Sequence, residues 1–369
     1  MKIHTLDLGF LDLAEAIAVF VVEGPTGLAL VETGPAATLP HLKAALAQHG
    51  WQIADFQHVF LTHIHFDHAG AAWAFAEKGA TIYVHPLGLP HLAAPEKLYN
   101  SARMIYGDAM DRLWGPMQPI PMAQLRAAGH GEVIEAAGLR FTAWHTPGHA
   151  VHHVAWEVVP VEDTPQIKAP SAPVAPPDPP VKGGDDLVEN IATRLPPIAI
   201  GDTPPEYHKE KTTTAQLAVL PPFTGGQGGA IFTGDVAGVR INGGPVMPPC
   251  PPPDIQVEDW LASIRLLGMV DAQTLYLTHF GPVIDKQPHL DALERQLLAW
   301  AEWMRPYAER QVPAAEIVPA FQDFVDAEMA ANGVTASMRQ RYEAANPAFM
   351  SVAGLLRYWK KRWTVDGRR

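Results

Sequence analysis

The residue types best suited to chemistry in this sequence are concentrated in one short run, His63–His68. The run reads His-Ile-His-Phe-Asp-His and places three imidazoles and one carboxylate within six residues. Burying such groups without partners is costly, and neighbouring imidazolium charges repel each other. A divalent metal removes both problems, because neutral histidine and ionised aspartate are metal ligands. The alternative is a solvated loop in a chain with 17 histidines, but the pattern favours metal chemistry.

Three other apolar runs also end in a ligand-type residue beside a glycine. They are residues 139–144, which lead to His149; residues 230–232, which lead to Asp235; and residues 275–277, which lead to His279. Strand ends at one edge of a sheet lie about 5 Å apart per strand. Loops at such an edge can converge on one point, and glycine allows the tight turns that this requires. We therefore expect these side chains to meet the first cluster.

The resulting set is large enough for two metals that share one ligand. One metal can be held by His63, His65 and His149, a second by Asp67, His68 and His279, and the two oxygens of Asp235 can bridge both. Each metal then keeps an open position, which is typical of a catalytic site.

The remaining histidines are interpreted as structural. His145, His152 and His153 are the closest competitors for a metal-binding role. If strand alternation continues through His152-His153, the two side chains lie on opposite faces, and one of them could hydrogen-bond to a ligand.

Composition limits the partners. The 369 residues are 47% hydrophobic, enough for one large or two modest cores, and carry a formal net charge of −12. Such a surface argues against nucleic acid and anionic membranes as partners. No run of about 18 apolar residues predicts a membrane span, and the N-terminus lacks the apolar core of a signal peptide. The single cysteine, Cys250, excludes an intramolecular disulfide and fits a cytoplasmic location. No activating base is evident near it, which argues against a cysteine nucleophile.

The elements expected to position the site alternate along the first 285 residues. Strands are predicted at 16–23, 28–32, 59–61, 80–85, 139–144, 154–159, 230–233 and 274–277, and helices at 36–49, 70–78, 97–113 and 257–269. The helix at 97–113, broken near Gly107, carries an aromatic stripe that either packs in the core or covers a pocket.

Two regions depart from this alternation. Residues 160–229 are rich in proline, glycine and aspartate and read as an insertion between two neighbouring strands, partly disordered at Lys168–Pro180. After Asp285 the pattern is helical, with segments from 286, at Ala314–Ala331 and at Met338–Trp363. The sequence thus predicts a catalytic domain at 1–285 and a helical region at 286–369. The basic, aromatic end at 357–363 is interpreted as a solvated helix end with packed tryptophans, and a site for an anionic group is the alternative.

The motifs His-x-His-x-Asp-His, Pro-Gly-His at 147–149, Thr-Gly-Asp at 233–235 and Thr-His-x-Gly at 278–281 resemble the metallo-β-lactamase superfamily. The resemblance covers about residues 1–285. It implies an α+β fold, a four-layer αββα sandwich, with a dinuclear site at the edge of the sheets. The bridging Asp235 and the helical C-terminus are most similar to the glyoxalase II-like branch. True metallo-β-lactamases generally lack that aspartate. Two features depart from the pattern: the 160–229 insertion, and Glu32-Thr33-Gly34 where the family usually has Asp-Thr-Gly.

The chemistry expected of such a site is hydrolysis. A hydroxide held by two divalent cations is a nucleophile at neutral pH, and Asp67 is placed to orient it and accept its proton. The expected substrate is a small ester, thioester or lactone. Tyr99, Tyr106 and Asn242 are predicted to contact it, beside Met104 and Trp114. Ligands without sulfur accept Zn²⁺, the first expectation, and also Fe²⁺ or Mn²⁺. A homodimer is a further expectation.

Three alternatives remain open at this point. One is a phosphodiesterase acting on a small phosphorylated substrate. Another is an iron-dependent oxidoreductase that resembles the persulfide dioxygenases and uses one iron. The third is a binding protein that kept the fold without turnover, which the complete ligand set disfavours.

Overall fold

The computed structural model describes residues 1–161 and 229–365, in which two mixed six-stranded sheets stack face to face. The first sheet contains, in spatial order, β1 (Lys2–Asp7), β2 (Ala18–Gly24), β3 (Gly27–Val31), β4 (Phe56–Phe60), β5 (Thr81–Val84) and β6 (Leu125–Ala127). The second sheet has the order β12-β11-β10-β9-β8-β7, with β7 (Val133–Ala136), β8 (Leu139–His145), β9 (Val154–Pro160), β10 (Gly229–Phe232), β11 (Ala272–Leu277) and β12 (Gly281–Val283).

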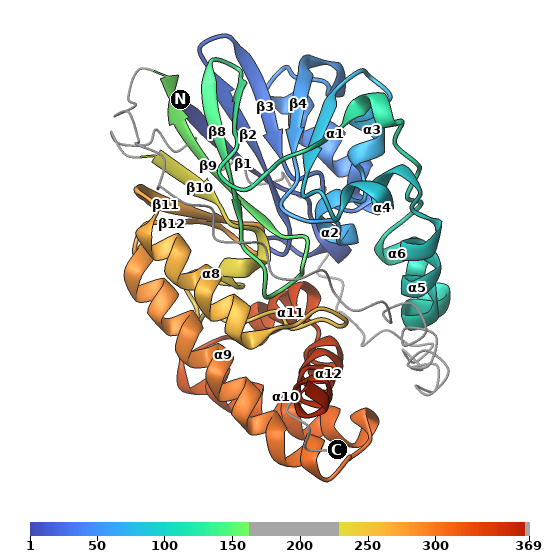
Figure 1. The fold of residues 1–369 in the computed structure, drawn as a ribbon, viewed down its shortest axis with the longest axis vertical. Helices are drawn as coiled ribbons and strands as arrows, with labels where there is room; N and C mark the ends of the chain where they lie inside the picture. Colours follow the sequence, from blue (N-terminus) through green and yellow to red (C-terminus); the bar gives the residue numbers. More distant parts are fainter. Residues whose placement is uncertain (162–228, 366–369) are drawn as a thin grey trace.

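Helices cover the outer face of each sheet (Figure 1). On the first sheet these are α1 (Leu39–Gln48) and α3 (Ala72–Ala76), and on the second α8 (Val257–Met269) and α9 (Lys286–Glu309). An aromatic core fills the space between the sheets, where the Phe60 and Phe141 rings stack 4.0 Å apart. The architecture is the predicted α+β sandwich of four layers.

The two strands that flank the proline-rich insertion pair with each other. β9 and β10 are antiparallel neighbours, with Trp156 opposite Phe232. The insertion therefore connects adjacent strands, as the sequence predicts. Its interior, including the disorder predicted at Lys168–Pro180, lies outside the described residues.

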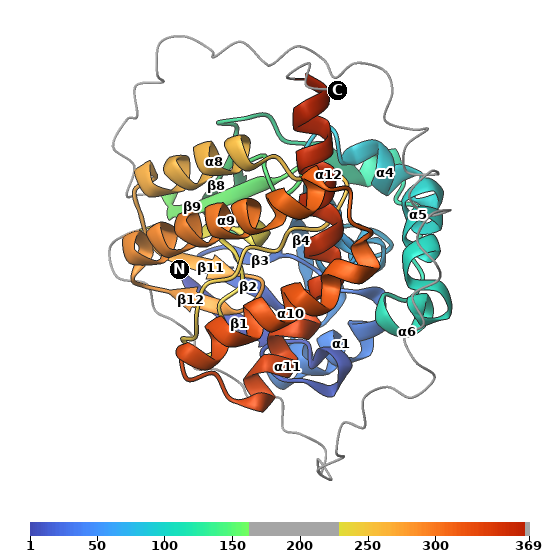
Figure 2. The same cartoon turned by 90° about the horizontal axis from the view of Figure 1, so that it is seen from below.

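Four helices follow β12, namely α9, α10 (Ala314–Ala331), α11 (Ala336–Ala345) and α12 (Ala348–Val365); α9 contacts β11, and α12 contacts both α9 and α10. Figure 2 shows them together, seen from below. The prediction of one helix over Met338–Trp363 is wrong, because the helix breaks between α11 and α12. Pro347 cannot donate a backbone hydrogen bond, and Asn346 before it leaves the helical region with φ −144° and ψ 78°. The helices share one apolar cluster with α8 and β11. The domain boundary at 285 stays a prediction.

Two short helical segments lie near the histidine cluster. α5 (Glu96–Tyr106) and α6 (Met110–Leu113) are separated at Gly107, whose φ of 52° favours glycine. Both pack on Phe66, which belongs to α2 (Phe66–Ala69) inside the histidine run. No helix within residues 1–161 and 229–365 is both long and apolar enough to cross a membrane.

Candidate metal centre

Loops at one edge of the two sheets bring the seven predicted ligands together. The histidine run follows β4, His149 follows β8, Asp235 lies in a short 3₁₀ turn after β10, and His279 follows β11. Close backbone packing needs glycine here. Gly234 has φ 48°, and a Cβ atom on it would lie 2.4 Å from the Thr62 hydroxyl oxygen. The tight turn places Asp235 against the histidine run.

The first group of ligand atoms comprises His63, His65, His149 and Asp235, and its atoms lie within 4.8 Å of one another. His65 Nδ1 lies 2.9 Å from His63 Nε2 and 3.2 Å from His149 Nε2. Three imidazole nitrogens thus point at one small volume.

The second group comprises Asp67, His68, Asp235 and His279. Asp67 Oδ2 lies 3.6 Å from His68 Nε2 and 3.4 Å from His279 Nε2. Asp235 belongs to both groups through different atoms. Its Oδ1 is 3.3 Å from both His68 Nε2 and His279 Nε2, whereas its Oδ2 is 3.3 Å from His149 Nε2. This is the geometry of a bridging carboxylate.

Outward hydrogen bonds orient four of the five imidazoles. A carbonyl or carboxylate oxygen accepts only from a protonated nitrogen, so it leaves the opposite ring nitrogen with its lone pair facing inward. The Nδ1 partners are the Thr62 hydroxyl for His63 (3.0 Å), Glu32 Oε1 for His68 (3.1 Å), the Pro249 carbonyl for His149 (2.9 Å) and the Ala16 carbonyl for His279 (2.7 Å).

The inward atoms fit a cation. His68 Nε2, His279 Nε2 and Asp235 Oδ1 are buried and have no hydrogen-bond partner. Buried polar atoms in a protein normally have partners, and within the part of the chain that the structure describes these three atoms face one another and Asp67 Oδ2, which are acceptors as well. Divalent cations therefore fit this set of donors, with one cation in each group.

Burial and charge shift the histidine pKa values of the two ligand groups in opposite directions. Burial, reinforced by neighbouring imidazoles, lowers the pKa of His63, and it lowers the pKa of His65 to about 4. Burial also opposes protonation of His68 and His279, but Asp67 and Asp235 outweigh it and raise the pKa of both imidazoles. The carboxylates are thus concentrated on the second group.

The sequence marks Glu32 only as a departure from the usual aspartate, and the structure adds it to the site. It is fully buried at the end of β3, with φ 66°. Its carboxylate accepts hydrogen bonds from the Thr62 hydroxyl, from Thr278 Oγ1 at 3.4 Å and from His68 Nδ1. A glutamate directly after a buried apolar strand was the available signal, since a buried charge requires partners.

The competing histidines surround the ligands without joining either group. His145 Nε2 donates to the Ala128 carbonyl at 2.8 Å. His152 and His153 are both buried, with ring centroids 6.2 Å and 5.0 Å from that of His63. His152 lies in a turn and His153 directly before β9, so the strand alternation on which the prediction of opposite faces rests does not extend to them.

The predicted substrate contacts lie at different distances from the ligands. Tyr106 ends α5 near Asp67; burial and that carboxylate raise its pKa. Its ring contacts Trp114 and also Phe349 of α12, with centroids 5.4 Å and 6.4 Å away. The Tyr99 hydroxyl instead donates to Asp111 on the exposed side.

Asn242 and Met104 are exposed. Asn242 lies two residues after Arg240, whose backbone N–H donates to the His279 carbonyl at 2.7 Å. The roles of Tyr99, Tyr106 and Asn242 stay predictions.

Comparison with known proteins agrees with this geometry. Residues 14–161 match the family model described as the metallo-beta-lactamase superfamily. The matched segment, which is similar to that superfamily, spans less than half of the chain.

Two solved structures share its fold. A metallo-beta-lactamase family protein from Thermus thermophilus is 19% identical, with a TM-score of 0.52 over 94% of this chain and 89% of that chain. An archaeal metallo-beta-lactamase superfamily protein from Sulfolobus tokodaii is 17% identical, with a TM-score of 0.50 over 81% and 85%. The superfamily and the two ligand groups together support a metal-dependent hydrolase.

Proposed function

We propose that this chain is a hydrolase of the metallo-β-lactamase superfamily and acts on a small ester, thioester or lactone at a centre of two divalent metals. The observation that carries the proposal is the position of Asp235, whose two oxygens face different ligand groups. The ligands are His63, His65 and His149 for one metal and Asp67, His68 and His279 for the other, with Asp235 shared.

When bound, two divalent cations would lower the pKa of an attacking water to about 7 and polarise the oxygen of the scissile bond. The residues of the chain then hold and move protons. Asp67 is 17% exposed, compared with 5% for Asp235. Asp67 therefore faces the accessible side of the site, where it can orient the attacking water and accept its proton. No serine or cysteine nucleophile is needed.

The surroundings favour an uncharged, apolar substrate. Tyr106, which lies near Asp67, belongs to a group of aromatic side chains in which its ring contacts Trp114 and Phe349, and Trp114 contacts Phe66. The chain carries a net charge of −12, which disfavours polyanions. The bridging aspartate and the C-terminal helices support the glyoxalase II-like branch. The ligand set, which contains only histidines and carboxylates, supports zinc.

A substrate panel on metal-replete protein tests the proposal. We expect turnover of p-nitrophenyl esters, aryl thioesters or lactones to exceed that of bis-p-nitrophenyl phosphate. The Asp67→Asn variant should lose at least about a hundredfold in kcat, the effect of removing a general base. Faster phosphodiester turnover would favour the phosphodiesterase alternative. Oxygen uptake with one iron per chain would favour the oxidoreductase.

A further inference from the structure

A proline-rich loop, residues 245–256, lies between the C-terminal helices and the metal centre. Its middle, Pro248–Pro253, reads Pro-Pro-Cys-Pro-Pro-Pro. Proline has no backbone N–H, so Cys250 is the only residue in this run with a backbone donor. The run cannot form a strand ladder of its own, and other elements must hold it in place.

Residues at the junction of α11 and α12 hold the loop in place through hydrogen bonds. The Cys250 N–H donates to Ser351 Oγ at 3.3 Å, and Ser351 Oγ donates to Asn346 Oδ1 at 2.9 Å. Asn346 Nδ2 then donates to the Pro248 carbonyl at 3.3 Å. Ser351 is fully buried. Two helix side chains therefore fix the loop on both sides of Pro249.

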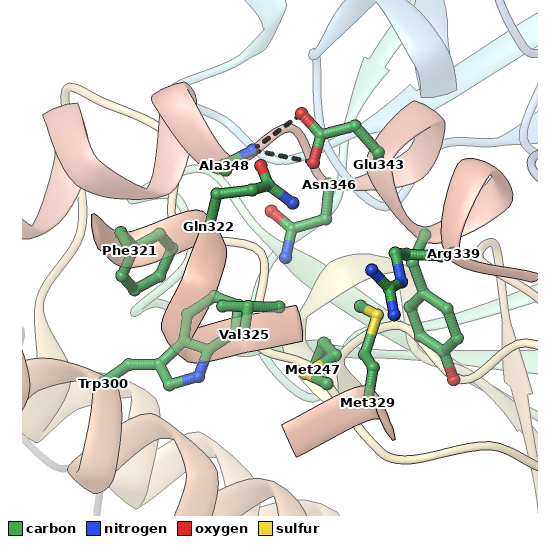
Figure 3. Close-up of a pocket in the computed structure, with 11 residues that line it drawn as sticks. Met247, Trp300, Phe321, Gln322, Val325, Met329, Arg339, Glu343, Asn346 and Ala348 are labelled. Atoms are coloured by element: carbon green, nitrogen blue, oxygen red, sulfur yellow. Dashed lines mark hydrogen bonds between the residues drawn. The ribbon is translucent and has the colours of Figure 1, made fainter. Parts of the chain in front are cut away.

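Further contacts from the same helices fix the rest of the loop. The Tyr342 hydroxyl donates to the Pro245 carbonyl at 2.7 Å. Lys361 Nζ donates to the Pro253 carbonyl at 2.9 Å. Gly354 leaves no room for a side chain, because a Cβ atom on it would lie 2.0 Å from the Cys250 carbonyl oxygen. Figure 3 shows Met247 of the loop in a pocket that it shares with Asn346 and other helix residues.

The fixed loop in turn orients a metal ligand. The Pro249 carbonyl accepts a hydrogen bond from His149 Nδ1 at 2.9 Å, and both residues are buried. That bond keeps the proton on Nδ1 and points the Nε2 lone pair at Asp235 and His65. The path from α12 to the ligand is thus Ser351, Cys250, Pro249 and His149.

We infer that Ser351 and Asn346 are positioning residues, through which the C-terminal helices set the affinity of the metal held by His149. The inference rests on the proposed dinuclear site. It gives the helical region a role in the metal centre that is separate from contacting substrate. Removing an outer hydrogen-bond partner of a ligand typically weakens metal binding 10–100-fold. Because Ser351 acts one residue away from Pro249, we expect about tenfold for its loss.

The test is a metal titration of the full-length protein against a chromophoric chelator, with the cobalt absorption spectrum as a second readout. The variants are Ser351→Ala, which removes the acceptor of the Cys250 N–H, and Asn346→Asp, which keeps the shape but removes the donor to Pro248. Ser351→Thr retains the hydroxyl and should restore binding. Ser337→Ala removes an exposed serine of α11 and serves as the matched control.

We expect one of the two dissociation constants to rise about tenfold in Ser351→Ala and Asn346→Asp, with a changed cobalt spectrum. The other constant should stay within twofold. Two metals bound with wild-type affinity in both variants would overturn the inference while leaving the proposed function intact. Equal weakening of both metals, with a lower melting temperature, would also overturn it, since it would show a general structural role. Fewer than two metals in the wild type would instead refute the dinuclear site itself.

Discussion

Replacing Glu32 should weaken the binding of the metal held by Asp67, His68 and His279 more than that of the other metal. The Glu32 carboxylate is buried and lies 3.1 Å from His68 Nδ1, whereas among the described residues it is linked to the first group only indirectly, through the Thr62 hydroxyl that is the Nδ1 partner of His63. In Glu32→Gln, Nε2 of the amide would face the Thr62 N–H, which now donates to Glu32 Oε2 at 3.4 Å. In Glu32→Asp the arm is shorter by one carbon–carbon bond, about 1.5 Å. Neither variant can keep all the present hydrogen bonds.

The size of the effect follows from the type of contact. Loss of an outer carboxylate partner of a histidine ligand costs about 10–100-fold in metal affinity, or about 1.4–2.7 kcal/mol. We expect this change for the metal of the Asp67, His68 and His279 group in both variants. The other dissociation constant should rise less, because Glu32 is linked to His63 only through the Thr62 hydroxyl and the orienting partner of His149 is the Pro249 carbonyl.

The assay is a competitive zinc titration that resolves both dissociation constants. Glu157→Gln is the matched control, since Glu157 is also a buried glutamate but lies within β9 and accepts its hydrogen bond from Trp144 Nε1. The control should bind both metals like the wild type. The reasoning is refuted if Glu32→Gln binds both metals with unchanged affinity, or if it weakens the two equally.

Two further predictions concern buried groups outside the ligand set. His289 of α9 donates through Nε2 to the carbonyl of Ala237 at 2.7 Å, and Ala237 lies two residues after Asp235. Burial lowers the pKa of His289 to about 4. An unfolded histidine binds its proton near pH 6.5, so this buried imidazole stabilises the fold fully above that pH and less as the pH falls toward 4. Measured by denaturant unfolding, the stability of the wild type relative to His289→Gln should fall by up to about 3 kcal/mol over that window, and a pH-independent difference would contradict the assignment. Burial raises the pKa of the fully buried Cys250 thiol, so a disulfide reagent should label it only after unfolding, whereas rapid labelling of the folded protein would contradict this packing.

The sequence was most informative where its signal was local. Strand and helix periodicity predicted the layers, and helix α8 begins and ends at the predicted residues Val257 and Met269. The ligand set was predictable because rare residue types ended several strands, and strand ends at one edge must lie close together. The structure brings all seven predicted ligands into two groups that share Asp235.

The rest depends on contacts between residues far apart in the chain. Glu32 contacts Thr278, and Ser351 contacts Cys250, and neither pairing leaves a periodic pattern in the sequence. The apolar spacing continues across Pro347 and therefore does not predict the break between α11 and α12, for which the proline itself is the signal. Tyr99 was predicted as a pocket residue from its place in an aromatic stripe, which cannot show that its hydroxyl faces Asp111.

The central claim is that Asp235 joins two metal sites in one chain. Elemental analysis of metal-replete protein, performed on the wild type and on Asp235→Asn, tests it most directly. The account predicts two divalent metals per wild-type chain, with fewer metals and little hydrolysis in the variant. A wild type that holds no metal, or an Asp235→Asn variant that keeps both metals and full hydrolysis, would contradict it.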